Sequence, residues 1–324
     1  MLFVIVTALL FVLELVYFKI AYWYNITDKP NLRSSHTNVT LRGGGVIFPI
    51  SVLVYFLIFG FHYFWFTVGL LAISAISFAD DIKHQPRTLR VLVQLFAVAL
   101  FFWKVNLFQQ QWYWWPVALI FTIGIVNAYN FMDGINGITT AYSFTILGSL
   151  FLLNRDLQLF DQNLVICLAL GNLVFAFFNF RKKAKCFAGD VGSVGMAFSL
   201  LFLTTWAIIT TGNFIFILFF ALYGVDSVLT ILHRLYKREN IFEAHRQHLF
   251  QYLANEQRIP QLMVSAMYML GQAIISIGVL LVWKKDPAIQ FTYAAIALLV
   301  PTITYICGKY WILRQMDRKF VMGK

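Results

Sequence analysis

Long apolar runs, separated by short polar segments, recur from one end of the chain to the other. By their length, these runs predict about eleven helices that each cross a bilayer, with boundaries uncertain by about 2–4 residues. They cover residues 1–22, 45–60, 63–79, 90–106, 113–129, 137–153, 162–180, 193–210, 213–232, 262–283 and 290–309. We therefore expect an all-α fold, a polytopic bundle of transmembrane helices in which residues 1–324 form one domain.

Composition supports a membrane protein. Of 324 residues, 60% are hydrophobic and 12% are charged, whereas about 25% of the residues in a soluble domain are charged. The net charge of +11 does not indicate nucleic acid as a partner, because the basic residues lie in short clusters between apolar runs. Cys167, Cys186 and Cys307 lack the spacing of a zinc site or a disulfide framework, and we expect all three to be buried.

The basic residues fall almost entirely in alternate connections between the predicted spans. One set contains Lys29, Arg33, Arg42, Lys83, Arg87, Arg90, Arg181, Lys182, Lys183, Lys185, Arg234, Lys237, Arg238, Arg246 and Arg258, followed by the basic C-terminal tail. The other set contains only Lys104, Arg155, Lys284 and Lys285. Because Lys and Arg accumulate in cytoplasmic loops, we predict an N-terminus outside and a C-terminus in the cytoplasm. Trp112, Trp114 and Trp115 would then form an outer interfacial belt.

Two adjacent carboxylates, Asp80 and Asp81, end the third predicted span, and Lys83 follows them. Charged groups at the edge of hydrocarbon are costly and are often functional. Adjacent carboxylates also resist ionising together unless a cation or a proton lies between them. The alternative is an interfacial helix end that simply needs polar groups, and this cluster alone does not decide between the two.

A second polar cluster ends the fifth predicted span and contains Asn127, Asn130, Asp133 and Asn136. The first three are three residues apart, so we expect them to share one face of a helix. Gly134 and Gly137 allow a turn or a close approach to a ligand. An ordinary turn would explain the Asp-Gly and Asn-Gly pairs, but not the oxygen-bearing side chains within the preceding helix.

Two further clusters lie in the second half of the chain. Asp190, flanked by glycines, opens the eighth predicted span, where it could hold a hard cation or simply cap the helix. The long connection at residues 234–261 contains His245, Arg246 and His248. Arg can hold phosphate with two hydrogen bonds, and His can act as a donor or a base, although a solvated amphipathic linker is the simpler explanation for this segment alone.

All four clusters are predicted on the cytoplasmic face, and together they indicate a site for a metal ion and a polyphosphate. The oxygen-only ligand set favours Mg²⁺, with Mn²⁺ as a substitute, over zinc. A secondary transporter or channel is the main alternative, because transporters also use intramembrane carboxylates. Transporters hold these groups near the bilayer midplane and often contain repeats, whereas here they gather at one interface and no repeat is visible.

The four clusters, in this order on a chain of many spans, resemble the polyprenyl-phosphate N-acetylhexosamine-1-phosphate transferase family. Residues 28–45, from Asp28 to the run Arg42-Gly43-Gly44-Gly45, resemble the first cytoplasmic loop of this family. The resemblance implies a Mg²⁺-dependent transfer of an N-acetylhexosamine 1-phosphate from a UDP-sugar to undecaprenyl phosphate, which releases UMP. UDP-GlcNAc or a related UDP-2-acetamido sugar is the expected donor.

The resemblance also implies roles for individual residues. Asp80 would position the prenyl phosphate or accept its proton, Asp81 would lie near the metal and diphosphate, and Lys83 belongs to the same motif. Asn130 and Asp190 would ligate the metal, and Asp133 would be an active-site aspartate. Asn136 would lie near the uridine. His245, Arg246 and His248 would form the sugar-recognition loop, residues 234–261.

The chain departs from the family pattern in two places. Asn136 stands where many bacterial members have Asp, a substitution that occurs within the family. His248-Leu249-Phe250-Gln251 stands where many members have a His-x-His-His run, which leaves the identity of the sugar open. The resemblance implies a bacterial inner membrane, an active site facing the cytoplasm, and the first step of O-antigen, capsule or a similar envelope glycan, with peptidoglycan less favoured. A homodimer is one option for the oligomeric state.

Overall fold

The computed structural model describes residues 1–28, 30, 39–241, 243 and 245–322, so Lys29 and Arg33 of the predicted basic set lie outside the described residues. The longer helices are α1 (Leu2–Trp23), α2 (Ile47–Ile58), α3 (Phe64–Ile82), α4 (Arg87–Lys104), α5 (Trp114–Met132), α6 (Ile138–Leu157), α7 (Gln162–Asn179), α8 (Gly189–Thr211), α9 (Ala221–Tyr236), α11 (Gln261–Val282) and α12 (Pro287–Met322). The short elements are strands β1 (Thr27–Asp28) and β2 (Thr40–Leu41), the helical turns η1 (Gly44–Val46), η2 (Leu107–Gln109) and η3 (Phe214–Phe220), helix α10 (Leu249–Gln251) and the π-helical turn η4 (Tyr252–Glu256).

Among the described residues, eight helical segments are long and apolar enough to cross a membrane. They belong to α1, α3, α5, α7, α8, the continuous pair η3 and α9, α11 and α12. The all-α membrane fold is therefore confirmed. Each predicted run also contains a helix, but α2 is only 12 residues long and α4 carries charged residues such as Arg87 and Arg90, so eleven crossings stays a prediction.

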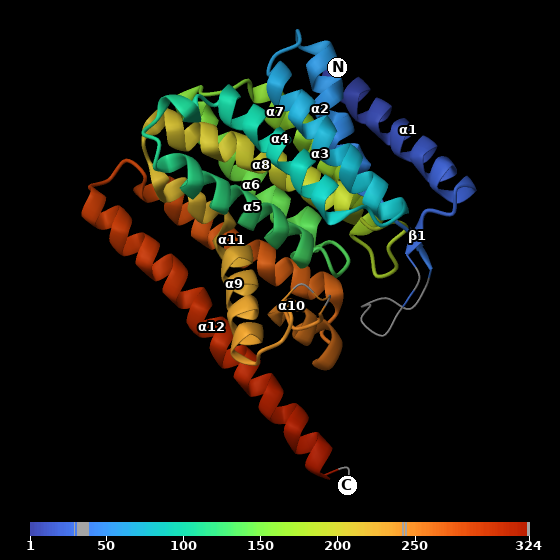
Figure 1. Cartoon of the computed structure of the whole chain (residues 1–324), viewed down its shortest axis with the longest axis vertical. Coiled ribbons are helices and arrows are strands. Elements are labelled where there is room, and N and C mark those ends of the chain that lie inside the picture. Colours follow the sequence, from blue (N-terminus) through green and yellow to red (C-terminus); the bar gives the residue numbers. More distant parts are fainter. Residues whose placement is uncertain (29, 31–38, 242, 244, 323–324) are drawn as a thin grey trace.

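Helix α8 lies at the centre of the bundle, because 78% of its apolar stretch is buried, whereas only 11% of the stretch in α12 is buried. It packs against α3, α5 and η1, and α6 packs against α7 and α11. Figure 1 shows α12 at the margin of the molecule, extending past the other helices toward the C-terminus. The exposed apolar side chains of α12 suit a lipid-facing position.

Successive helices run in opposite directions. Tyr55, near the end of α2, donates a hydrogen bond to Asp161, just before α7, and the Asp161 N–H donates to Tyr63, just before α3. At the opposite end, the N–H of Asp190 in the first turn of α8 donates to Asp81 in the last turn of α3. We call the end where α3 finishes and α8 begins the polar end, and the other the far end.

The predicted basic-poor set lies at the far end. Lys104 lies over the rings of Tyr63 and Trp206, and Lys284 pairs with Asp156. The basic-rich set, which includes Arg42 and Arg90, lies at the polar end. The two ends thus differ in charge as the alternation predicts, while the side of the membrane that each faces stays a prediction.

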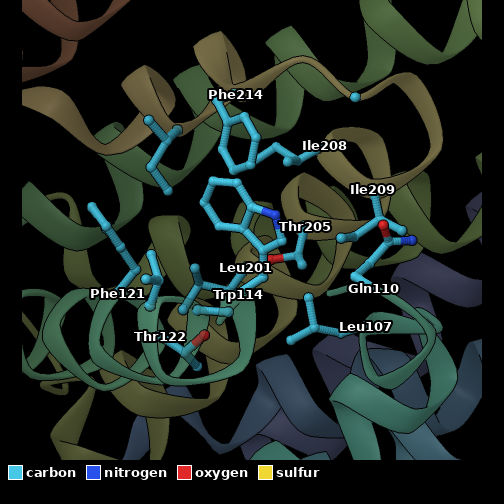
Figure 2. Close-up of a pocket in the computed structure, with 14 residues that line it drawn as sticks. Leu107, Gln110, Trp114, Phe121, Thr122, Leu201, Thr205, Ile208, Ile209 and Phe214 are labelled. Atoms are coloured by element: carbon cyan, nitrogen blue, oxygen red, sulfur yellow. The ribbon is translucent and has the colours of Figure 1, made fainter. Parts of the chain in front are cut away.

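An apolar cavity of about 260 Å³ lies at the far end between α5, α8, η2 and η3. Figure 2 shows Trp114 directed into it, and its ring stacks on Phe214 at 4.8 Å between centroids. Trp112 and Trp115 are exposed, as an interfacial belt requires, but Trp114 lines the cavity instead. The prediction of three buried cysteines is also wrong for one residue, because Cys307 is exposed on α12.

Within the ninth predicted run, the helix changes from 3₁₀ geometry in η3 to α geometry in α9. The change from 3₁₀ to α geometry frees backbone groups, which cost several kcal/mol if left unpaired in hydrocarbon. The buried side chain of Gln272 satisfies two of them, because it accepts from the N–H of Leu222 and donates to the carbonyl of Leu218. A side chain from α11 therefore stabilises this change of helix geometry. The change lies about one turn before Asp226 of α9.

Candidate active site

The Arg42-Gly43-Gly44-Gly45 segment packs directly on the start of α8. The N–H groups of Gly44 and Gly45 donate to the carbonyls of Phe187 and Ala188 at 2.9 and 3.0 Å. A Cβ on Gly45 would lie 2.3 Å from the Cα of Gly192, so only glycine permits this approach. The close packing brings Arg42 beside the first turn of α8.

Asp81 links α3, α8 and Arg42. Its carboxylate accepts the N–H groups of Asp190 and Val191 at 2.9 and 3.0 Å, which caps the N-terminus of α8. The Nε atom of Arg42 lies 2.7 Å from the same carboxylate, and its Nη2 atom lies 3.2 Å from Asp190. The Asp81 side chain is fully buried, whereas that of Asp190 is 26% exposed, so Asp190 is the more accessible to a ligand.

Asp80 turns to a different partner. Its carboxylate pairs with Arg90 of α4 at 2.5 Å and accepts the N–H of Gln85 at 2.6 Å. The two adjacent carboxylates are therefore each neutralised by their own arginine rather than by one shared cation. Lys83 follows α3 in extended backbone and is exposed.

Asp80 and Asp190 line a polar cavity of about 50 Å³ between α3, α4, α5 and α8. Asn127 and Asn130 line the same cavity, which confirms that these two share one face of α5. Asn130 also donates to the Ser193 hydroxyl at 3.1 Å. The expectation that Asp133 shares this face is wrong, because α5 ends at Met132 and Asp133 has left the helical conformation.

The Asp133 carboxylate accepts a hydrogen bond from the hydroxyl of Thr139 in α6. Burial raises the pKa of Asp133 to about 7, against the effect of the Thr139 hydroxyl, and the negative charges of Asp190 and Asp81 raise it further. Asp133 therefore shares one electrostatic environment with these two carboxylates and can exchange a proton near neutral pH.

Asn136 ties three segments together. Its side-chain amide donates to the carbonyl of Arg181 at 2.9 Å, its N–H donates to Gln261, and its carbonyl accepts the hydroxyl of Ser265. These contacts join the turn after α5 to the connection before α8 and to α11. Asn136 is also buried, so in this arrangement it holds the framework around the site, and its predicted place near a uridine stays a prediction.

The predicted loop at 234–261 contains the end of α9, α10 and η4, and it packs on the polar end. Arg246 pairs with Glu256 at 2.9 Å, and Lys309 of α12 donates to the carbonyl of Gln247 at 2.9 Å. His245 and His248 stack at 5.0 Å between ring centroids. The ring centroids of His245 and His248 lie 6.4 and 6.3 Å from that of Phe131, which is next to Asn130 in the sequence. The loop therefore borders the second polar cluster.

His248 is held by a residue that the sequence analysis did not select. Its Nδ1 atom lies 2.9 Å from the carboxylate of Asp226, which is buried in α9. Burial lowers the pKa of His245 to about 4, and the charges of His248 and Arg234 add to this effect. A single carboxylate inside the apolar run of α9 was the signal that could have identified Asp226.

The side chains that line the polar cavity match the ligands expected for Mg²⁺ only in part. The side chains of Asp80, Asn127, Asn130 and Asp190 line one cavity and supply oxygen atoms, the ligands that Mg²⁺ prefers. Within the described residues, however, no three His, Cys, Asp or Glu side chains are grouped as a metal site. Because Mg²⁺ usually binds one or two carboxylates and completes its shell with water and substrate phosphate, this donor set fits an ion that arrives with a phosphate ligand.

Comparison with known proteins supports the resemblance to one family. Residues 63–211, from the start of α3 to the end of α8, match the model of glycosyl transferase family 4. The match includes Asp80, Asn130 and Asp190 but neither Arg42 nor the loop at 234–261.

The relatives are, by name, transferases of phosphorylated N-acetyl sugars. The chain is 25% identical over 278 residues to a probable undecaprenyl-phosphate N-acetylglucosaminyl 1-phosphate transferase of Bacillus subtilis, covering 78% of this chain and 76% of the relative. It is 31% identical over 195 residues to the phospho-N-acetylmuramoyl-pentapeptide-transferase of Thermotoga neapolitana, covering 58% of each. It is 29% identical over 198 residues to that of a Synechococcus strain, covering 53% of this chain and 57% of the relative. The chain thus spans less than two thirds of the latter two relatives, and the family model and these relatives support the resemblance that its sequence motifs predicted.

Proposed function

We propose that this protein transfers an N-acetylhexosamine 1-phosphate from a UDP-sugar to undecaprenyl phosphate. The observation that carries the proposal is the convergence of Asp80, Asn130 and Asp190 on one polar cavity within the family match. The relative from Bacillus subtilis supports UDP-N-acetylglucosamine, or a related UDP-2-acetamido sugar, as the donor.

In the proposed reaction, an oxygen of the prenyl phosphate forms a bond to the phosphorus that bears the sugar. The bond between this phosphorus and the oxygen of UMP breaks, and UMP leaves with the electron pair. The products are undecaprenyl-diphospho-sugar and UMP. Phosphoryl transfer of this kind depends mainly on alignment and on neutralising negative charge.

The basic side chains of the site provide that neutralisation. Arg42 and Arg90 lie against Asp190 and Asp80, and each is partly exposed, so each can turn toward phosphate. We propose that Asn130 and Asp190 hold a Mg²⁺ ion, which would neutralise charge on the diphosphate. Arg246 of the loop would assist the leaving UMP, and Asp133 can take up the proton carried by a monoanionic prenyl phosphate.

The acceptor also needs room for a hydrocarbon chain. An apolar cavity of about 430 Å³ lies between α9, α11 and α12, with Asp226 and Tyr268 in its wall. Leu249 and Leu253 of the loop close the same cavity. A prenyl chain in this cavity would have its phosphate near the loop and the polar end, where the donor would bind.

The charge difference between the two ends supports a cytoplasmic polar end, since basic residues accumulate on that side of a membrane. We therefore propose a bacterial inner membrane, an N-terminus outside, and a site that meets UDP-sugars in the cytoplasm. The product would begin the synthesis of an O-antigen, a capsule or a similar envelope glycan.

The test is Mg²⁺-dependent release of UMP by the purified protein, with undecaprenyl phosphate and a panel of UDP-N-acetyl sugars. We expect release that requires both metal and lipid acceptor, and its loss in Asp190→Ala and Asp80→Asn. No release from any sugar, with protein shown to be folded, would overturn the proposal and favour the transporter interpretation.

A further inference from the structure

Asp226 is an isolated carboxylate in the apolar run of α9, and it is 2% exposed. Four donors surround it. One oxygen accepts from Thr230, from the N–H of Leu249 and from His248, and the other accepts from the hydroxyl of Tyr268. A carboxylate that accepts this many hydrogen bonds is held in its charged form at a fixed position.

The imidazole of His248 is fixed by this contact. Because an ionised carboxylate can only accept, the Nδ1 atom that faces Asp226 must carry a hydrogen. The other nitrogen, Nε2, is buried and has no hydrogen-bond partner within the described part of the chain. Buried polar atoms are almost always paired, so the free Nε2 atom points to a ligand that is bound only during function.

The loop has anchors other than the contact between Asp226 and His248. Lys309 donates to the carbonyl of Gln247, and the side chain of Gln251 accepts the N–H of His248 at the start of the short helix α10. Arg246 pairs with Glu256 in η4. A purely structural role for Asp226 would therefore duplicate anchors that already exist, and it would leave the unpaired Nε2 atom unexplained.

We infer that Asp226 is a positioning residue, which fixes the ring and the protonated Nδ1 atom of His248 so that Nε2 meets the diphosphate-sugar of the donor. This inference rests on the proposed transferase function. Asp226 does not itself touch the reacting atoms; it acts through His248, as the acidic member of a catalytic triad acts through its histidine.

A double-mutant cycle on UMP release tests the inference. His248→Asn keeps a donor for the buried carboxylate but removes Nε2, and Asp226→Asn keeps the shape but removes the charge. We expect Asp226→Asn to lower kcat by about 10- to 100-fold with KM for the UDP-sugar changed much less. In the His248→Asn background, Asp226→Asn should lower kcat no further, because the residue through which Asp226 acts is already absent.

Thr230→Val is the matched control, since it removes a hydrogen bond to Asp226 with little change of shape and leaves the contact with His248. Its kcat should stay within about threefold of the wild type. If Asp226→Asn does not fold, as judged by thermal melting, Asp226→Glu replaces it, because Glu keeps the charge and moves it by one methylene. We then expect a smaller loss of kcat that His248→Asn again masks.

The two proposals fail separately. A folded wild-type protein that releases no UMP overturns the transferase proposal and this inference with it. An active wild type in which Asp226→Asn retains full kcat, or in which the losses from Asp226 and His248 add, overturns only the positioning role. A loss of the same size in Thr230→Val would also overturn it, because general damage to the buried network would then suffice.

Discussion

The N–H of Asp190 donates a hydrogen bond of 2.9 Å to the carboxylate of Asp81, so one acidic residue of the candidate site fixes the helix that carries another. Arg42 contacts both side chains and offsets their charge. Asp81 is fully buried and has all its contacts within the protein, whereas Asp190 is partly exposed beside the polar cavity. In this arrangement one carboxylate of the pair is buried and caps α8, the other can meet a ligand, and the predicted place of Asp81 near the metal and diphosphate stays a prediction.

Asp81→Asn should weaken the fold more than Asp190→Asn. The first change removes the charged cap of α8 and the buried partner of Arg42, and we expect it to lower the free energy of unfolding by about 2 kcal/mol. The free energy of unfolding of Asp190→Asn should stay within about 1 kcal/mol of the wild-type value, because the Asp190 side chain is partly exposed. Thermal unfolding in detergent measures both values, and an Asp81→Asn protein as stable as the wild type would contradict this assignment.

Activity should require the simultaneous contacts of the Arg42 guanidinium group with Asp81 and Asp190, and not only its charge. Arg42→Lys keeps the charge, but a single ammonium group cannot copy a guanidinium that reaches Asp81 and Asp190 together. We expect kcat/KM for UMP release to fall by about tenfold in Arg42→Lys and further in Arg42→Gln. Arg155→Gln, at the exposed far end of α6, is the control and should retain wild-type activity.

Asp133 should make the stability of the protein depend on pH. Because burial raises its pKa from 3.8 to about 7 in the folded state, its contribution is fully present below about pH 4 and is lost as the pH rises through about 7. Asp133→Asn, which resembles the protonated form, should match the wild type at low pH. At pH 8 its Tm should be higher by on the order of 5 °C, and equal Tm values there would refute the raised pKa.

Gly45 should tolerate no side chain. A Cβ at this position would meet the Cα of Gly192 at 2.3 Å and the carbonyl oxygen of Ala188 at 2.8 Å, and neither backbone atom can move alone. We expect Gly45→Ala to lower Tm and to cut activity, because it would displace Arg42 from α8. Gly148→Ala, where nothing lies within 4 Å, should be neutral or stabilising by about 0.5–1 kcal/mol.

Single cysteines should report which side of the membrane each end faces. The exposed native Cys307 is first replaced by Ser, and cysteine is then introduced at Lys83 of the polar end or at Lys284 of the far end. A maleimide that cannot cross membranes should label Lys284→Cys in intact cells and Lys83→Cys only after permeabilisation. The reverse pattern would invert the predicted orientation.

The sequence determined the helices and the places where polar groups collect. Run length and hydrophobicity are local properties, so each predicted run contains a helix, and the polar clusters at Asp80, Asn130 and Asp190 were visible before any contact was known. The motifs also predicted the resemblance to glycosyl transferase family 4, whose model matches residues 63–211. The departure of Asp133 from the face of α5 was missed, because the helix end depends on the turn at Gly134 and on a hydroxyl from α6.

The tertiary structure decided which groups meet. Asp80 and Asp81 are neighbours in sequence, yet one pairs with α4 and the other caps α8, because successive helix positions point about 100° apart toward different neighbours. Asp226 of α9 and His248 of the following loop lie 22 residues apart, and no periodicity relates them. Such contacts depend on how the helices pack and on how the chain returns between them, and these are properties of the whole bundle rather than of any one segment.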